Sequence, residues 1–251
     1  MLSAKRASYR IALTAIFATT YFILGTIPVF PLATGGFLRA NKVLAPLTGM
    51  VLGPGLAGAS MVLGSFMTVA FSGQPPILPL GPLPLDFVPD ATVAIVSGLT
   101  FVGKAKAALG VPLLMIISYF IDPISVAFVP VGGMEVPFAW LHILSVLVLA
   151  AAFFLHRQRQ ISRRGVAFIA AIAFASLLSG QLAGTIVGQN VSVRFGTLAL
   201  SAWQGKVETW PWGFFYTYPI ERIIYAAASV LVAVPVLRAI TRRIEGAIVS
   251  E

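Results

Sequence analysis

The chain has 251 residues, of which 58% are hydrophobic and only 10% are charged, and its formal net charge is +9. Such a composition excludes a soluble globular protein, because the apolar side chains need lipid as their solvent. The sequence contains no cysteine, which excludes disulfides, thiolate metal sites and cysteine nucleophiles. Most cations stand singly or in pairs at the ends of apolar runs, so membrane orientation and anionic lipid headgroups explain them better than nucleic acid.

Apolar runs bounded by charged residues, proline or glycine are candidate membrane helices. Eight such runs cover residues 9–27, 43–52, 55–71, 87–102, 107–128, 138–155, 166–188 and 215–239. No long linker or low-complexity tract separates them. We therefore expect an all-α fold, a polytopic transmembrane helical bundle of about eight segments that forms a single integral membrane domain over residues 1–251.

The second run, residues 43–52, is shorter than a normal membrane span. About 20 residues are needed to cross a hydrocarbon core of about 30 Å. The run is therefore either a re-entrant piece or part of a helix that begins further back, near Gly36.

The positive charges define an orientation, because cytoplasmic loops carry an excess of Lys and Arg. Twelve of the 17 Lys and Arg residues can lie on one side, and they are Lys5, Arg6, Arg10, Lys104, Lys106, Arg157, Arg159, Arg163, Arg164, Arg238, Arg242 and Arg243. They place both termini in the cytoplasm of a multi-pass protein of the cell membrane. This orientation requires Gly53-Pro54-Gly55 to be a tight turn on the cytoplasmic side.

The opposite, outer side receives the mixed polar residues. They are Arg39, Lys42, Arg194, Lys206 and Arg222 together with the carboxylates Asp86, Asp90, Asp122, Glu135, Glu208 and Glu221. The tryptophans Trp140, Trp203, Trp210 and Trp212 also fall toward this face, either as an aromatic belt at the interface or as platforms for a ligand.

No sequence motif for catalysis is present, neither a P-loop nor a zinc-protease or serine-hydrolase motif. We therefore expect no enzyme and no cofactor. A metal site is also not expected, because the outer histidine and carboxylates lack tight ligand spacing.

Ionisable residues inside membrane spans are costly and are functional candidates by default. Asp86 and Asp90 are four residues apart, so they share a helix face where they either complement the helix dipole or belong to a site. Asp122 precedes Pro123, about a turn and a half inside its predicted span, and needs a partner or a wet cavity.

Two neighbouring charged residues, Glu221 and Arg222, do not face each other on a helix, so each is expected to pair elsewhere. Arg222 or Arg39 could pair with Asp90 or Asp122 inside an outward cavity. His142, two residues after Trp140, either packs at a helix end or contacts a ligand.

Small residues recur every fourth position at Ser176, Gly180, Gly184 and Gly188, a pattern typical of close helix packing in membranes. The contact is either internal or between subunits. A basic seam over residues 156–164 separates six segments, within residues 1–156, from an additional helix pair in residues 165–243, which could be an appendage.

Three stretches of the first six segments resemble the substrate-binding S-component of energy-coupling factor transporters, a family of six-helix membrane proteins that capture vitamins or metal ions. The stretches are Arg10-Ile-Ala-Leu-Thr-Ala-Ile-Phe-Ala18, Leu47-Thr-Gly-Met-Val-Leu-Gly-Pro-Gly-Leu-Ala-Gly58 and Asp86-Phe-Val-Pro-Asp90, the last leading into a helix that ends before Lys104 and Lys106.

The resemblance implies that loops on the outer face hold the substrate. Here these loops are residues 30–42, which carry Arg39, Asn41 and Lys42, and the proline-rich residues 72–86. It also implies a transmembrane coupling subunit and separate ATPases as partners, docked on small residues of the first helix. The family's Ala-x-x-x-Ala pattern is replaced here by pairs such as Ala15-x-x-x-Thr19, and Ala12 lies on the same helix.

We therefore expect a small-molecule binding component of an uptake transporter, for a vitamin or another micronutrient. Its expected binding residues are Arg39, Asn41, Lys42, Asp86, Asp90, Asp122, Trp140, His142 and Arg222, and its helix-packing or partner residues are Ala12, Ala15, Thr19, Gly180, Gly184 and Gly188. The alternatives are a structural or assembly subunit of a larger membrane complex and an ion-coupled secondary transporter.

Overall fold

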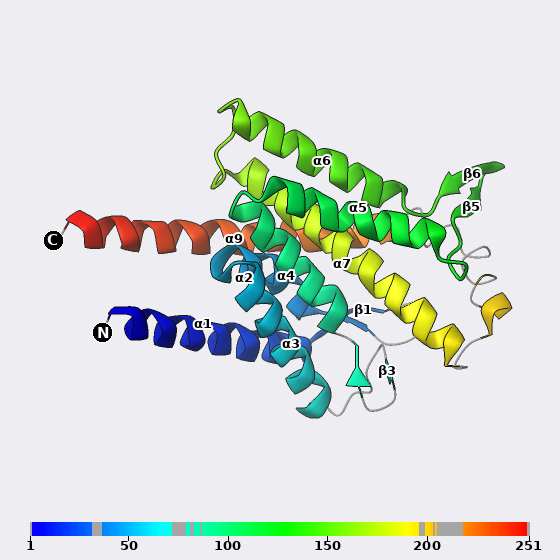
Figure 1. Cartoon of the computed structure of the whole chain (residues 1–251), viewed down its shortest axis with the longest axis horizontal. Helices are drawn as coiled ribbons and strands as arrows, with labels where there is room; N and C mark the ends of the chain where they lie inside the picture. The colour runs from blue at the N-terminus through cyan, green and yellow to red at the C-terminus, as the bar shows by residue number, and fades with distance from the viewer. Residues whose placement is uncertain are drawn as a thin grey trace.

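A computed structural model describes residues 2–31, 37–71, 79–80, 83–85, 87–195, 199–202, 204 and 218–249. Its main helices, shown in Figure 1, are α1 (Leu2–Gly25), α2 (Leu44–Leu52), α3 (Pro54–Phe71), α4 (Phe87–Phe101), α5 (Ala105–Ile121), α6 (Trp140–Arg157), α7 (Val166–Arg194) and α9 (Tyr218–Val249). Each of the eight predicted apolar segments overlaps one of these helices. The expectation of an all-α fold is confirmed.

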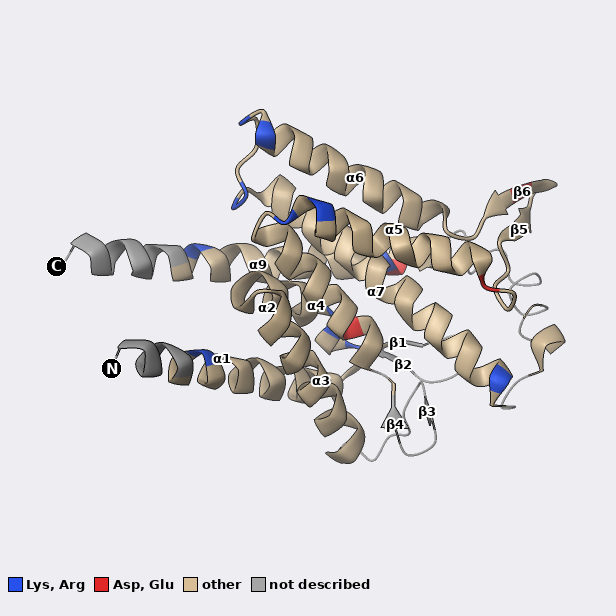
Figure 2. Cartoon of the chain, in the orientation of Figure 1, with Lys and Arg blue, Asp and Glu red and all other residues tan. Residues whose placement is uncertain are grey.

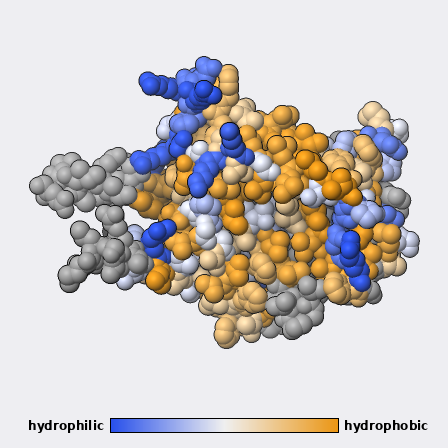
Figure 3. Space-filling view, in the orientation of Figure 1, coloured by the Kyte–Doolittle hydropathy of each residue, from blue (hydrophilic) through white to orange (hydrophobic). Residues whose placement is uncertain are grey.

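Five of the described helices are long and apolar enough to cross a membrane, namely α1, α3, α6, α7 and α9. The helices α4 and α5 are apolar but shorter, with 15 and 17 residues. Large apolar side chains such as Leu114, Leu147 and Leu231 point outward from the bundle, and Figure 3 shows a broad apolar surface between two more polar ends. By length and composition, the chain is a multi-pass membrane protein.

The centre of the bundle is the contact between α4 and α7, which glycines permit. A Cβ atom on Gly180 would lie 2.4 Å from the carbonyl oxygen of Pro89, and one on Gly184 would lie 3.1 Å from the Pro89 ring. Gly188 is also buried in α7. The small-residue stripe of α7 therefore makes an internal helix contact, as membrane helices do where their backbones approach closely.

The interpretation of the last two helices as an appendage is wrong for α7. In the apolar stretch of α7, 72% of the residues are buried, the largest share among the five long described helices. The stripe that lets α4 approach also places α7 inside the bundle, where Phe168, Ile169 and Leu178 are fully enclosed. The seam over residues 156–164 is a turn between two packed helices.

The short second segment is longer than its apolar run suggests. A 3₁₀ turn, η1 (Ala40–Val43), continues directly into α2. Together they extend about 22 Å, from rises of about 2.0 Å and 1.5 Å per residue. The helical run thus begins at Ala40 and not near Gly36.

Gly53 ends α2 with a φ of +75°, which glycine adopts without strain. The turn that follows rests on the last turns of α4, because a Cβ on Gly98 would lie 2.6 Å from the Pro54 nitrogen. The Gly-Pro-Gly turn therefore lies at the same end of the bundle as Lys104, which is the arrangement that the charge pattern required.

Three short antiparallel hairpins lie at the end of the bundle opposite to the chain termini (Figure 1). They pair β1 (Pro28–Pro31) with β2 (Phe37–Arg39), β3 (Pro79–Leu80) with β4 (Leu83–Pro84), and β5 (Phe128–Val131) with β6 (Met134–Pro137). The helix α5 ends at Ile121, short of the end of the predicted segment 107–128, and of that segment only Phe128 belongs to the last hairpin. That segment stops early because Asp122 precedes Pro123, which disfavours helical geometry, and Asp122 has an extended ψ of 120°.

Candidate functional site

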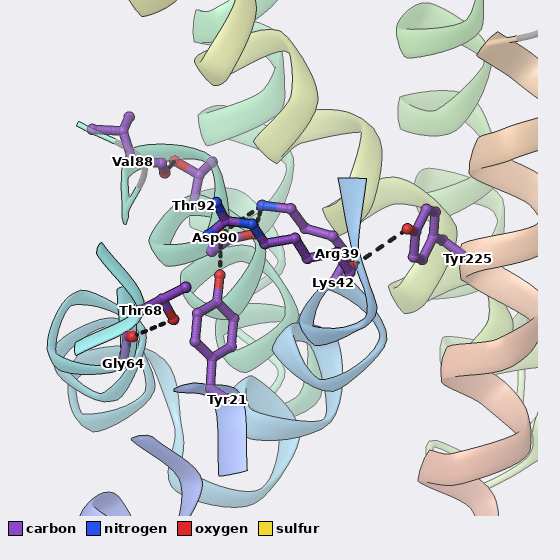
Figure 4. A network of polar contacts seen from close by, with 9 residues as sticks. All are labelled: Tyr21, Arg39, Lys42, Gly64, Thr68, Val88, Asp90, Thr92 and Tyr225. Carbon is purple, nitrogen blue, oxygen red and sulfur yellow. Dashed lines mark hydrogen bonds and ion pairs between the residues drawn. The ribbon is translucent and has the colours of Figure 1, made fainter. Parts of the chain in front are cut away.

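A buried ion pair lies between the hairpin end of α4 and the 3₁₀ turn. The carboxylate of Asp90, 2% exposed, accepts hydrogen bonds from Lys42 Nζ at 2.7 Å and 2.6 Å. The hydroxyl of Tyr21 donates to the same carboxylate (Figure 4). The carboxylate of Asp90 thus joins three elements that are distant in sequence, α1, η1 and α4. Asp90 has a charged partner in addition to its place in the first turn of α4.

The segment that carries the cations is held by α9. The Tyr225 hydroxyl donates to the Arg39 carbonyl oxygen at 3.3 Å, and the Ser229 hydroxyl donates to the Val43 carbonyl oxygen at 3.0 Å. Arg39 and Asn41 are themselves 9% and 4% exposed, and Figure 4 shows the Arg39 side chain beside Lys42 and Asp90. The structure therefore brings together four of the predicted binding residues.

A second polar group joins α6, α7 and α9. His142 Nε2 lies 2.6 Å from Gln181 Oε1, and the Tyr218 hydroxyl donates to the same oxygen at 2.8 Å. Since an amide oxygen carries no proton, Nε2 of His142 must donate. The other ring nitrogen, Nδ1, is buried and has no hydrogen-bond partner among the described residues. His142 is thus a buried polar residue with one unused acceptor.

Aromatic rings extend this group across the bundle. Tyr119 stacks on Phe138 at 4.8 Å, Phe138 on His142 at 6.4 Å, and His142 on Tyr218 at 5.9 Å between ring centroids. The guanidinium carbon of Arg222 lies 5.3 Å from the centre of the Tyr218 ring, within cation–π range. The ladder fixes the position of Arg222 relative to His142.

Glu221 and Arg222 form an ion pair of their own, with Nη2 and Oε1 3.1 Å apart. The expectation that these neighbours pair elsewhere is wrong, because long side chains from adjacent positions can bend toward each other when both are buried. Both residues are largely buried, at 9% and 8% exposed. Among the described residues, Arg222 pairs with Glu221 and Lys42 with Asp90.

Asp122 belongs to a separate, third group. It ends α5, and its carboxylate accepts from Gln189 Nε2 at 2.7 Å, from Asn190 Nδ2 at 2.5 Å and from the Ile124 amide at 3.1 Å. Ser125 contacts the Gln189 amide as well. Asp122 thus ties the end of α5 to α7, and the amides of Gln189, Asn190 and Ile124 are the partners that this carboxylate was expected to need.

The remaining predicted residues lie as follows. Trp140 is the first residue of α6 and is half-buried, and Asp86 lies outside the described residues, as do the other three tryptophans. Ala12, Ala15 and Thr19 are exposed on one face of α1, whereas Ala18 on the opposite face is buried near Gly64. Gly180, Gly184 and Gly188 pack internally.

Sequence reasoning did not single out Tyr21, Tyr218, Tyr225 and Ser229, which complete these networks. No local pattern marks them, because their partners are up to 186 positions away. Gln181 carried a signal, as an amide inside a membrane helix, and it bonds His142 and Tyr218.

The first two groups together hold three cations, Arg39, Lys42 and Arg222, and two carboxylates, Asp90 and Glu221. Figure 2 shows blue and red positions close together inside the bundle. The described residues contain no group of three or more metal-binding side chains. The arrangement therefore offers charged groups and hydrogen bonds to a polar molecule.

The chain matches no protein family model, no curated protein and no solved structure.

Proposed function

We propose that the protein is the membrane-embedded small-molecule binding component of an uptake transporter, which binds its ligand from the outer side and relies on a separate ATPase. The observation that carries this proposal is the buried cluster of Arg39, Lys42, Asp90, Glu221 and Arg222. Ionisable groups are retained inside a membrane bundle mainly where they serve a ligand or ion. The cluster sits at one end of the bundle, which suits capture from one side.

The charge pattern supports the outer side for this cluster. The described cations of the α4–α5 and α6–α7 connections lie at the same end, since the Arg163 guanidinium packs against Gly103. Figure 2 shows blue positions at this end, where α1 begins and α9 ends. Tyr21, Asp90 and Arg222 each lie at the opposite end of their helices. The positive-inside rule then makes the termini cytoplasmic and the cluster extracytoplasmic.

An exposed small-residue face on α1 supports a partner subunit. Ala12, Ala15 and Thr19 are exposed toward the lipid side of the helix, and small residues allow another helix to approach closely. The stripe on α7, by contrast, is occupied by α4. This removes the main reason to propose α7 as a docking helix for an assembly subunit.

Native mass spectrometry of the gently purified protein tests the proposal. We expect a retained small molecule and co-purifying ATP-hydrolysing subunits. The variant Ala15→Leu should lose the subunits and keep the small molecule, whereas Ala151→Leu, an equally exposed alanine on α6, should lose neither. A protein that carries no small molecule and no ATPase under these conditions would contradict the proposal.

Ion-coupled transport is the second candidate, because buried carboxylates such as Asp90 can exchange ions. Uptake into proteoliposomes that contain this chain alone, driven only by an ion gradient, would favour it over an ATPase-dependent component.

A further inference from the structure

A second charged region lies at the end of the bundle opposite to Asp90, where α4 is followed by α5 and α6 by α7. The two connections touch, because the guanidinium of Arg163 lies directly over Gly103: a Cβ atom built on this glycine would be 2.4 Å from Nη2 and 2.7 Å from Cζ. Gly103 has a φ of +83°, which favours glycine and keeps the position free of a side chain. The cations of both connections therefore form one surface, here called the basic patch, which consists of Lys104, Lys106, Arg157, Arg159, Arg163 and Arg164.

The chain segments that build the basic patch contain no carboxylate. Neither residues 91–121 nor residues 136–207 include an Asp or a Glu. Arg163 is half-buried, and the other five cations of the patch are exposed. Figure 2 shows blue positions where α6 ends and where α5 begins. The patch is therefore a positive surface that its own segments do not neutralise.

Arg163 is held in place by a neutral group. Its Nε donates a hydrogen bond to His156 Nε2 at 2.9 Å. His156 Nδ1 lies 3.0 Å from the Ile161 carbonyl oxygen, which can only accept, so Nδ1 carries the ring proton and Nε2 accepts. Neither of the described ion pairs includes Arg163. The histidine thus orients the guanidinium and leaves its charge uncompensated, which prepares it for an anion.

Exposed apolar side chains flank the basic patch in the chain. Val102, Phe154 and Val166 are 47%, 61% and 49% exposed. Val102 precedes Gly103, Phe154 lies in the last turn of α6, and Val166 begins α7. Figure 3 shows hydrophilic side chains next to apolar surface at this end of the molecule. Cations beside apolar side chains match an amphiphile that has an anionic head and apolar chains.

Among anionic heads, a phosphate ester suits the patch. A guanidinium binds two phosphate oxygens with parallel N–H groups. The phosphates of membrane lipids also lie at the depth where apolar helices end, whereas a soluble anion gains nothing from the exposed apolar side chains. We infer that the basic patch binds the phosphate headgroup of an anionic phospholipid, with Arg163 as its central contact. This inference does not depend on the proposed function, since it concerns the opposite end of the bundle.

Native mass spectrometry of the delipidated protein, with added phosphatidylglycerol or phosphatidylcholine of the same acyl chains, measures the binding. Phosphatidylglycerol should bind with the higher affinity, and a higher ammonium acetate concentration should weaken its binding, because exposed charges are screened. Inorganic phosphate at equal concentration should not displace it, since phosphate lacks the chains. Equal affinities for the two lipids, or displacement by inorganic phosphate, would overturn the inference.

Variants of Arg163 test the position of the site. Arg163→Gln should lower the affinity for phosphatidylglycerol about fivefold, the contribution of one cation near an anionic surface. Arg163→Lys should lose less, because it keeps the charge without the planar guanidinium. The matched control Arg10→Gln removes an exposed arginine from the first half of α1 and should leave the affinity unchanged. An equal loss in Arg163→Gln and Arg10→Gln would show a diffuse effect of net charge and overturn the site.

Arg164→Gln, at an exposed position, keeps the test decisive if Arg163→Gln does not fold, and it should also lower the affinity about fivefold. The same spectra report co-purifying protein subunits. If the variants of the patch lost such subunits and bound phosphatidylglycerol unchanged, the patch would be a protein-docking surface and the inference would be wrong.

Discussion

The two aspartates at the ends of described helices, Asp90 in α4 and Asp122 after α5, have opposite surroundings. Asp90 lies in the first turn of α4 and is held by the ammonium of Lys42 and the hydroxyl of Tyr21. Asp122 lies at the end of α5 and is held by two side-chain amides and a backbone amide. Asp90 is therefore paired with a cation from a different element, whereas Asp122 is bound by neutral amides at the end of a helix.

The comparison separates a candidate binding site from a structural contact between helices. A carboxylate whose oxygens already accept hydrogen bonds from neutral amides is not available to bind a ligand. A buried ion pair costs desolvation of two charges, and its neighbours Arg39 and Arg222 add further cations. The amide-bound Asp122 stabilises the contact between α5 and α7, and the ion pair of Asp90 is suited to ligand binding.

The largest expected effect comes from Lys42→Ala. The substitution leaves the carboxylate of Asp90 buried without its cation, which should cost about 3–5 kcal/mol of the free energy of unfolding. Denaturant titration in mixed micelles measures this value. The double variant Lys42→Ala/Asp90→Asn should be more stable than Lys42→Ala alone. A double variant that is no more stable would show that the pair is not the cause.

Asp122→Ala should have the next largest effect. Without the carboxylate, the amides of Gln189 and Asn190 lose their shared acceptor, and we expect a loss of about 2–3 kcal/mol in the same titration. Asp122→Asn should lose less, since its amide oxygen still accepts. Neither variant should change ligand retention. A change in retention would place Asp122 in the site and end the distinction between the two aspartates.

The sequence predicted helices better than contacts, and these two aspartates show why. Hydropathy reports the apolar surface of each helix, so all eight segments could be located. The end of α5 was placed too late, although Pro123 marks it, and the hairpin of β5 and β6 was not predicted, although Gly132-Gly133 between two β-rich runs is a known hairpin signal.

The partners of Asp90 could not be chosen from sequence. Tyr21 and Lys42 lie 69 and 48 positions away, and only the packing of α1, η1 and α4 brings them to Asp90. The family resemblance indicated the loop around Lys42 as a candidate binding loop, but it did not indicate which residues pair there.

Tyr21→Phe should have a smaller effect than Lys42→Ala or Asp122→Ala. It removes one hydrogen bond to a buried carboxylate, which is worth about 1.5–2 kcal/mol. Tyr9→Phe is the matched control, because Tyr9 lies on the same helix and is 66% exposed. Equal stability of the two variants would mean that the Tyr21 hydroxyl does not support Asp90.

Ser229→Ala should have the smallest effect, about 0.5–1 kcal/mol, because it removes one neutral hydrogen bond between α9 and the Val43 carbonyl oxygen. Ser201→Ala, at an exposed serine, serves as its control. Thermal unfolding resolves the difference. A loss as large as that of Asp122→Ala would mean that α9 contributes more to holding η1 than this single bond suggests.

Ligand retention in two matched variants tests the central claim most directly. Lys42→Gln keeps a hydrogen-bonding side chain beside Asp90 but removes the charge, and Asp122→Asn does the same for the amide-bonded aspartate. Native mass spectrometry of both purified, monodisperse proteins should show the small molecule lost from Lys42→Gln and kept by Asp122→Asn. Retention by Lys42→Gln, or loss from Asp122→Asn, would contradict the assignment of the binding site to the Asp90 cluster.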